Sequence, residues 1–242
     1  MRLNFVWLQT ENARQKKKEI HIENATSFVI YAAIATNYNI EKFDVDEEIN
    51  YETIVDKSIC STLEDGYDNI KNEHINVHKM QYEKVSLSIN DSEKNYMPTD
   101  VRLEAIKSGE WDDSFFVLYF NFSRYLLMCS SGKSATLPAN LQGKWCHGFT
   151  PPWGSDYHTN INLQMNYWPA LPLNMAETMT PYIDFVSRLS QYGKSTAKEL
   201  YGANGWVVHH NTDIFGRTGI HDGAAWGTFP LAALWLCLNL WE

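Results

Sequence analysis

The segment 153–169, with the sequence WGSDYHTNINLQMNYWP, constrains the fold more than any other part of the chain. It interleaves amide and imidazole side chains with tyrosine and tryptophan rings, beginning at Trp153. A core strand would not carry so many amides, because each buried amide without partners costs about 1–3 kcal/mol. A solvated loop would not carry so many aromatic rings. The mixture predicts the wall of a pocket for a polar, ring-shaped ligand such as a sugar.

Composition excludes several classes of protein. The chain has 242 residues, which is room for one large domain or two small ones. Its formal charge of −9 argues against a surface that binds nucleic acid, and its one basic run, 14–18, is short enough for a solvated hairpin. The four cysteines form no C-x-x-C pair, so zinc and redox motifs are absent. We therefore expect no nucleic-acid partner, no metal and no cofactor.

The two ends of the sequence bear on location and completeness. No signal-peptide pattern opens the chain, and the longest apolar run, 230–241, is too short to span a bilayer, so no membrane association is expected. The sequence stops inside a helical pattern without a cap, glycine or proline. We expect it to be a truncated piece of a longer protein, and its compartment stays open.

Hydrophobic periodicity predicts an α+β chain in three parts. Residues 1–48 alternate as strands and include the apolar run 27–35, which predicts a strand buried on both sides and part of a β-sandwich. Residues 49–108 form a helical linker region. Residues 109–242 contain helices separated by long loops, which predict a toroid of helices whose active face is built from those loops.

Individual elements follow from the same patterns. In the linker region we expect helices at 51–63, 67–82 and 101–108, a short strand at 83–89, and a cap from Thr99 and Asp100. In the last part the helix at 111–128 is apolar nearly all round, which predicts that it is buried. A further helix is expected from Thr180, interrupted at Gly193 and continued at 197–201, and another begins at Pro230.

Asn160 and Asn162 are the first candidates for chemistry. Two residues apart in an extended segment, their side chains would face the same side. An amide oxygen can hold a water molecule, which a nearby carboxylate can polarise. The alternative is that both amides bond the backbone of their own loop.

The segment 205–227 supplies a second group of candidates. His209 and His210 are followed by Asp213, and metal binding is the weaker interpretation because neighbouring histidines diverge and no third ligand is close. Hydrogen bonding to hydroxyls, or bracing of the loop, is favoured. Trp206 and Trp226 flank these residues, and two tryptophans beside histidines favour a ligand over hydrophobic plugs.

Other hydrolytic machinery is missing from the sequence. There is no G-x-S-x-G nucleophile motif and no phosphate-binding loop. Ordinary glycosidases use two carboxylates across the scissile bond. Asp156, Glu177, Asp213 and Asp222 lie near the candidate segments, and none stands out as such a pair.

Three segments carry a resemblance to a known family. Residues 135–145 (ATLPANLQGKW), 151–170 (PPWGSDYHTNINLQMNYWPA) and 205–216 (GWVVHHNTDIFG) resemble the glycoside hydrolase family 95 α-L-fucosidases, and the likeness extends from about residue 70 to the end. The resemblance implies a β-sandwich, a helical linker and an (α/α)6 catalytic barrel. This chain would hold the tail of the sandwich, the linker and roughly the first half of the barrel.

The resemblance also implies a mechanism. The family removes terminal α-1,2-linked L-fucose from glycans with inversion, using an asparagine that holds the attacking water. By motif that base is Asn162, assisted by Asn160, while His158 contacts the sugar and separates fucose from L-galactose. The general acid and an assisting aspartate would lie beyond Glu242. The chain alone is therefore expected to be inactive and to need the remainder of its own barrel as partner.

Residues and resemblance together give a set of expected substrate-binding side chains: His158, Trp153, Trp206, His210, Asp213 and Trp226. The expected partner is a fucosylated oligosaccharide or glycan. Two alternatives stay open, a non-catalytic or decayed carbohydrate-binding protein and an α-L-galactosidase, against which His158 argues. Members of the family are commonly periplasmic or extracellular.

Overall fold

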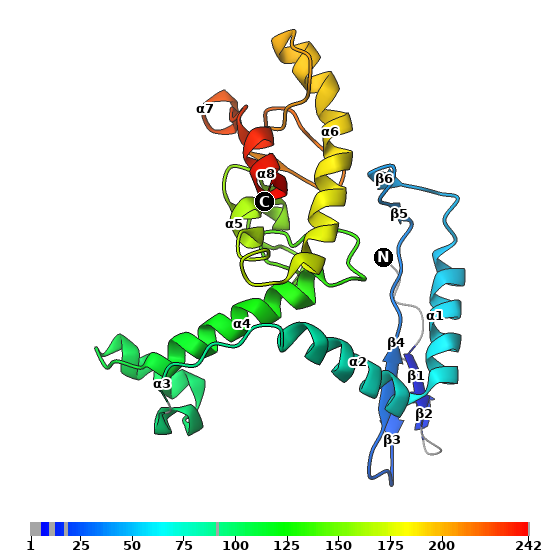
Figure 1. Cartoon of the computed structure of the whole chain (residues 1–242). Coiled ribbons are helices and arrows are strands. Elements are labelled where there is room, and N and C mark those ends of the chain that lie inside the picture. Colours follow the sequence, from blue (N-terminus) through cyan, green and yellow to red (C-terminus); the bar gives the residue numbers. More distant parts are fainter. Residues whose placement is uncertain (1–5, 10–12, 17–18, 91, 242) are drawn as a thin grey trace. The chain divides into compact units, whose positions relative to one another are not determined.

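The structure, a computed structural model, describes residues 6–9, 13–16, 19–90 and 92–241. The chain divides into two compact units, Met1–Lys79 and Met80–Glu242. It is mostly helical, and its strands form small two-stranded sheets (Figure 1). The three-part division expected from the sequence, with boundaries at 48 and 108, stays a prediction.

The described residues of the first unit form three antiparallel strand pairs. β1 (Val6–Gln9) pairs with β4 (Val29–Ala32), β2 (Ala13–Lys16) with β3 (Glu19–Ile22), and β5 (Tyr38–Asn39) with β6 (Asp44–Val45). Part of the basic run lies in β2, within a hairpin as expected; residues 17 and 18 lie outside the described residues. That these pairs belong to a β-sandwich stays a prediction.

The apolar run 27–35 does contain a strand, but its predicted burial on both sides is wrong. In β4 Tyr31 is buried, whereas Ile30 is 52% exposed, and Phe28, just before the strand, is 53% exposed. The reason is that β4 pairs with one strand only, and a two-stranded sheet has no second layer to cover its outer face.

Two helices follow as the sequence predicts. α1 (Tyr51–Asp65) begins after Asn50, whose side chain accepts a hydrogen bond from the Thr53 N–H at 3.0 Å. It ends at Gly66, whose φ of 73° favours glycine. α2 spans Tyr67–Tyr82. The strand predicted at 83–89 is not found, and the Tyr82 and Val85 carbonyls accept hydrogen bonds from the Arg124 guanidinium instead of a strand partner.

The second unit is built from helices and long loops. Its α-helices are α3 (Thr99–Lys107), α4 (Asp113–Ser131), α5 (Asn162–Tyr167), α6 (Thr180–Tyr201), α7 (Ala224–Gly227) and α8 (Ala232–Trp241). Three 3-10 turns join them: η1 (Glu93–Tyr96), η2 (Pro152–Ser155) and η3 (Ala176–Met179). α3 begins after Pro98 without a side-chain cap, so the cap expected from Thr99 and Asp100 is wrong. The interruption expected at Gly193 is also wrong, because α6 runs unbroken through it. Glycine serves close packing there, since a Cβ would lie 2.5 Å from the Val207 carbonyl oxygen.

The core of this unit lies where α6, α8 and α5 meet. α8 contacts both α5 and α6. The fully buried side chains there are Leu163, Tyr167, Tyr182, Phe185, Leu189 and Leu236. The Tyr167 hydroxyl also bonds Ser131 Oγ at 2.5 Å and accepts from the Ala139 N–H at 2.7 Å, and burial raises the pKa of Tyr167 to about 12. Tyr167 thus joins α5 to the end of α4 and to the loop that follows it.

α4 is the longest predicted apolar helix, but the expectation that it is buried all round is wrong. One side carries the buried residues Arg124, Leu127 and Met128. Of its aromatic residues, Phe116, Tyr119, Phe122 and Tyr125 are all at least 41% exposed. An apolar sequence shows that a helix could be buried, but its actual burial depends on neighbouring elements. In this unit the described elements cover α4 only in part.

The last apolar segment bears on whether the chain associates with a membrane, which the sequence analysis did not expect. Residues Ala224–Trp241 are long and apolar enough to cross a membrane by length and composition. The structure divides them into α7 and α8, separated by a turn that contains Pro230. The Asn239 side chain donates to the Gln164 carbonyl at 2.9 Å, and Leu236 is fully buried. One side of α8 is therefore packed into this unit, whereas Leu234, Leu238 and Trp241 are exposed.

Candidate active site

The two segments singled out in the sequence, 153–169 and 205–216, meet in one short antiparallel ribbon. β7 (Tyr157–His158) pairs with β8 (Asn211–Thr212), so that His158 lies opposite Asn211. Beyond β7 the chain stays attached, because the Thr159 N–H donates to the His210 carbonyl at 2.8 Å. The ribbon therefore brings the candidate amides and imidazoles together.

Polar side chains cluster on this ribbon. His158 Nδ1 lies 2.7 Å from Asp156 Oδ1, and the Asn211 amide donates to Asp156 Oδ2 at 3.1 Å. The His158 and His210 rings stand edge to face with centroids 6.1 Å apart. His210 Nε2 lies 3.2 Å from Asp222 Oδ2. Titratable groups thus run from η2 across the ribbon to the loop before α7.

Burial sets the electrostatics of the cluster. Removal from water raises the pKa of the Asp156 carboxyl, while His158 and Arg217 partly oppose this shift. Polar atoms of several residues here are buried and have no hydrogen-bond partner among the described residues: Asn160 Oδ1, Gln164 Oε1, His210 Nδ1, Asn211 Oδ1 and Thr212 Oγ1. Buried polar groups without partners are rare in folded proteins, so such a concentration marks a place where water or a polar ligand binds.

The sequence predicted that the two candidate asparagines share one extended segment, and this prediction is wrong. Asn160 lies in a turn after β7, and its N–H donates to the His210 carbonyl at 3.2 Å. Asn162 is the first residue of α5 and is exposed. The turn allows this arrangement because Gln164, two residues into the helix, donates back to the Thr159 carbonyl at 2.6 Å. Alternation along a strand is therefore not what relates the two amides.

His209 serves the fold. It is fully buried, its Nδ1 accepts the Phe229 N–H at 3.1 Å, and its Nε2 lies 3.2 Å from the Tyr201 hydroxyl. Its carbonyl also accepts a hydrogen bond from the Thr159 hydroxyl. Burial, with a smaller contribution from His210, lowers the pKa of His209 below 6.5, so the neutral ring is favoured in the folded protein.

Replacing His209 with Asn is expected to weaken the pH dependence of stability. In the unfolded wild type, His209 binds a proton near pH 6.5, whereas in the folded protein it binds one only at a lower pH. The free energy of unfolding is therefore highest above pH 6.5 and falls as the pH drops below that value. His209→Asn keeps a hydrogen-bond acceptor but removes the titration. Thermal unfolding followed between pH 7.5 and 5.5 should show a smaller fall in Tm for the variant. Equal falls in both proteins would contradict this role.

The remaining predicted binding residues have different surroundings. Trp206 is half-buried, and its ring packs on α6 at Gly193, where even a Cβ atom would lie only 3.1 Å from the ring. This contact fits the alternative that Trp206 is a hydrophobic plug. Trp153 and Trp226 are 76% and 83% exposed. Asp213 Oδ1 accepts the Phe215 N–H at 2.9 Å and braces its own loop. The ribbon brings together His158 and His210, whereas for the tryptophans and Asp213 sugar contact stays a prediction.

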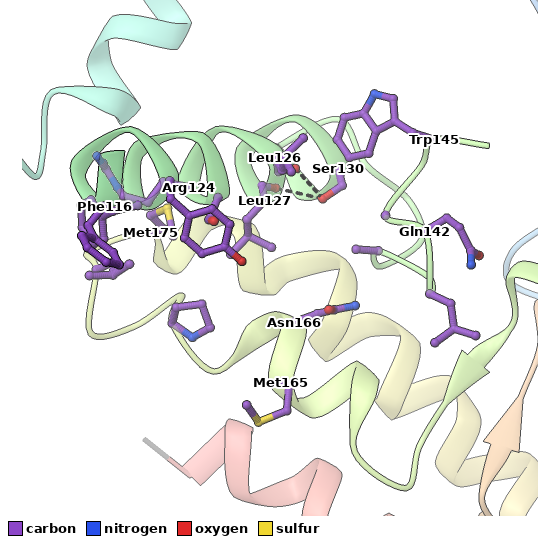
Figure 2. A pocket seen from close by; sticks show the side chains of 18 residues that line it. Phe116, Arg124, Leu126, Leu127, Ser130, Gln142, Trp145, Met165, Asn166 and Met175 are labelled. Atoms are coloured by element: carbon purple, nitrogen blue, oxygen red, sulfur yellow. Dashed lines mark hydrogen bonds between the residues drawn. The ribbon is translucent and has the colours of Figure 1, made fainter. Parts of the chain in front are cut away.

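A cavity of about 730 Å³ lies elsewhere in this unit. Figure 2 shows it between α4 on one side and α5, with Met165 and Asn166, on the other, with Trp145 at its edge. Its lining is largely aromatic and aliphatic, and it includes none of the residues predicted for the site. We interpret it as a largely apolar groove beside α4. Two buried polar atoms without partners among the described residues, Arg124 Nε and Gln142 Oε1, belong to its lining, whereas more of them lie on and around the ribbon.

Sequence reasoning missed two residues of the cluster. It noted Asp156 only as a nearby acid, and it did not consider Asn211 as more than a neighbour of the histidines. The spacing Asp156-x-His158 in an extended segment was the available signal, because it puts both side chains on one face. For Asn211 no local signal existed, since its contact to Asp156 depends on strand pairing across 55 residues. No three His, Cys, Asp or Glu residues are grouped for a metal in the part of the chain that the structure describes.

The second unit thus consists of helices joined by long loops, with a buried polar ribbon formed by two of the loops. Comparison with known families identifies it as part of a glycoside hydrolase catalytic domain. Residues 66–242 match the glycosyl hydrolase family 95 catalytic domain, so the chain belongs to that family and carries a portion of its (α/α)6 barrel. The match covers both strands of the ribbon and every element of the candidate site.

Individual relatives are similar over nearly the whole chain. It is 35% identical over 232 residues to alpha-L-fucosidase 2 from Arabidopsis thaliana, covering 93% of this chain and 27% of the relative. It is 30% identical over 223 residues to a probable alpha-fucosidase A from Aspergillus niger, covering 89% of this chain and 28% of the relative. The chain thus spans little more than a quarter of the length of these relatives.

Proposed function

We propose that this chain supplies the fucose-binding wall and the water-holding amides of an inverting exo-α-L-fucosidase that removes terminal α-1,2-linked L-fucose from glycans. Membership of family 95 and relatives named as α-fucosidases support the substrate class. Asn162 is the proposed base that holds the attacking water, Asn160 assists it, and His158 and His210 hydrogen-bond the sugar.

One observation carries the proposal. Asn160 Oδ1 is buried beside the ribbon and has no hydrogen-bond partner within the described ranges, although the same residue's N–H is bonded to His210. An amide used to brace its own loop would spend this oxygen on the main chain. A buried amide oxygen without a partner, in the turn that follows His158, is instead suited to accept a hydrogen bond from a water molecule that faces a bound sugar.

The chemistry requires help from outside the described cluster. In an inverting hydrolysis, a base deprotonates the water on one face of the sugar while an acid protonates the leaving oxygen on the other face. A neutral amide can orient and polarise water but cannot keep its proton, so the proton must pass on to a carboxylate. We place that carboxylate and the general acid in the remainder of the barrel.

Two apolar surfaces of the second unit are proposed contacts for that remainder. The exposed aromatic side of α4 is one of them. The other lies on α8, where an apolar hollow of about 580 Å³ is lined by Phe229, Leu231, Leu234, Trp235, Cys237, Leu238 and Trp241. Patches of this kind on a soluble protein mark interfaces, and further barrel helices would bury both.

Activity of the completed protein tests the proposal. In a chimera, this chain replaces the matching 27% of the Arabidopsis relative, so that the rest of the barrel comes from a complete protein. We expect release of L-fucose from 2′-fucosyllactose, with β-L-fucose appearing first in the proton NMR spectrum, while residues 1–242 alone release fucose at least about 10²-fold more slowly. The unmodified relative is the control for folding and assay.

Each contrary outcome has a distinct meaning. A folded chimera that binds L-fucose without hydrolysis would contradict the enzyme and favour the carbohydrate-binding alternative. Faster release of L-galactose than of L-fucose would favour the α-L-galactosidase. Appearance of the α anomer first would contradict inversion.

A further inference from the structure

We propose that Asp156 is a positioning residue that fixes the ring orientation and the tautomer of His158, so that His158 Nε2 faces the sugar as a hydrogen-bond acceptor. This inference rests on the proposed function for the identity of the ligand. The geometry that carries it is independent of that function.

The first step is the contact itself. Asp156 and His158 are two residues apart at the start of β7, so extended backbone puts their side chains on one face of the ribbon. Asp156 Oδ1 and His158 Nδ1 lie 2.7 Å apart, although the angle departs from ideal hydrogen-bond geometry. A carboxylate oxygen and an unprotonated ring nitrogen would repel each other at this distance. Neither atom has another hydrogen-bond partner among the described residues, so we place the proton on Nδ1, on the side of Asp156.

The second step is that the carboxylate is itself held. The Asn211 amide donates to Asp156 Oδ2 at 3.1 Å, and Asn211 is the cross-strand partner of His158 in β8. The Asp156 backbone is fixed as well, because its carbonyl accepts the Leu141 N–H at 3.2 Å. Asp156 is thus anchored from two other segments, β8 and the loop at Leu141, and cannot follow His158 if the ring rotates.

The third step is burial. The side chains of Asp156 and His158 are only 15% and 17% exposed, so water competes weakly for their contact. The comparable pair of His210 and Asp222, next to β8, differs, since Asp222 lies 3.2 Å from His210 but is 57% exposed. Solvent screens an exposed contact, and we therefore assign the positioning role to Asp156 and not to Asp222.

The consequence concerns the other ring nitrogen. With the proton held on Nδ1, the neutral ring leaves a lone pair on Nε2, which accepts a hydrogen bond from a sugar hydroxyl. An imidazole free to rotate or to exchange tautomers would present a donor as readily as an acceptor. Asp156 thereby turns His158 into a selective partner for a hydroxyl at one position of the sugar.

Asp156→Asn is the test, made in the chimera that carries this chain. Asn211 donates to the oxygen at position 156, so the new amide nitrogen faces His158 Nδ1 and donates to it. We expect the proton of His158 to move to Nε2, which ¹⁵N chemical shifts of labelled histidine would report. The kcat/KM for 2′-fucosyllactose should fall about ten- to a hundredfold, mostly through KM. Asp184→Asn, on the exposed side of α6, is the matched control and should change neither quantity.

The outcomes separate this inference from the proposed function. An inactive wild-type chimera would overturn the function, while the His158 tautomer in the folded wild type would still decide the positioning role. A wild-type spectrum with the proton on Nε2 would overturn the inference without any variant. So would an Asp156→Asn protein with an unchanged spectrum and unchanged kcat/KM.

Discussion

Asn162→Ala and Asn160→Ala are each expected to lower the release of fucose from 2′-fucosyllactose by about 10²–10⁴-fold in the chimera, with little change in fold. The reason is that both amide oxygens are proposed to hold the attacking water. Asn160 Oδ1 is buried without a partner among the described residues, so truncation removes no bond on which the loop depends. Initial rates with 2′-fucosyllactose, and circular dichroism for the fold, are the measurements.

A matched control comes from the same helix. Asn166 lies one turn after Asn162 in α5, lines the α4–α5 cavity and donates only a long hydrogen bond, 3.4 Å, to the Asn140 carbonyl. Asn166→Ala should keep near wild-type turnover. Wild-type turnover in Asn162→Ala and Asn160→Ala would remove the proposed mechanism, and a loss in Asn166→Ala as large as theirs would show that the effect is not specific to the site.

The second large effect concerns stability. Asp112→Asn is expected to lower the free energy of unfolding by about 3–5 kcal/mol, because it leaves a buried guanidinium without its carboxylate. Arg102 and Asp112 are both buried, with Arg102 Nε donating to Oδ2 at 2.9 Å and Nη2 donating to Oδ1 at 3.1 Å. Asp112 also accepts the Phe115 N–H at 3.0 Å and caps α4. Urea unfolding of wild type and variant measures the difference.

Two further measurements make this prediction specific. The Arg102 guanidinium is the main cause that lowers the pKa of Asp112 from 3.8 to about 2, so the stabilisation is present above pH 3.8 and is lost as the pH falls toward 2. The wild type should lose stability in that range more than Asp112→Asn does. Glu104→Gln, which breaks an exposed pair with Lys107 at 2.7 Å, should cost about 1 kcal/mol or less. A similar cost for both variants would contradict the account.

The sequence predicted the local elements well where single residues mark their ends. Asn50 and Gly66 delimit α1, and α2 spans 67–82 as expected, because capping and left-handed backbone are local effects. Burial was predicted poorly. The aromatic residues of α4 and the apolar run of β4 were expected to be covered on all sides, but what covers a face depends on other elements of the fold.

The candidate site shows the same division between local and tertiary information. Residue types alone pointed to the segments around His158 and His210, since amides and imidazoles among aromatic rings suit few other roles. The sequence did not reveal that Asn162 opens a helix, nor that Trp206 packs on α6. The first rests on a side-chain bond from Gln164 to the Thr159 carbonyl that no capping pattern announces. The packing of Trp206, and the pairing of β7 with β8 that joins Asp156 to Asn211, depend on residues distant in the chain.

A crystal structure of the chimera with bound L-fucose would test the central claim most directly. The account predicts that the sugar lies against the β7–β8 ribbon, with a water molecule within hydrogen-bond distance of Asn160 Oδ1 and of the Asn162 side chain, and facing the anomeric carbon. A sugar bound instead in the groove between α4 and α5, or amide oxygens bonded to their own main chain, would contradict it.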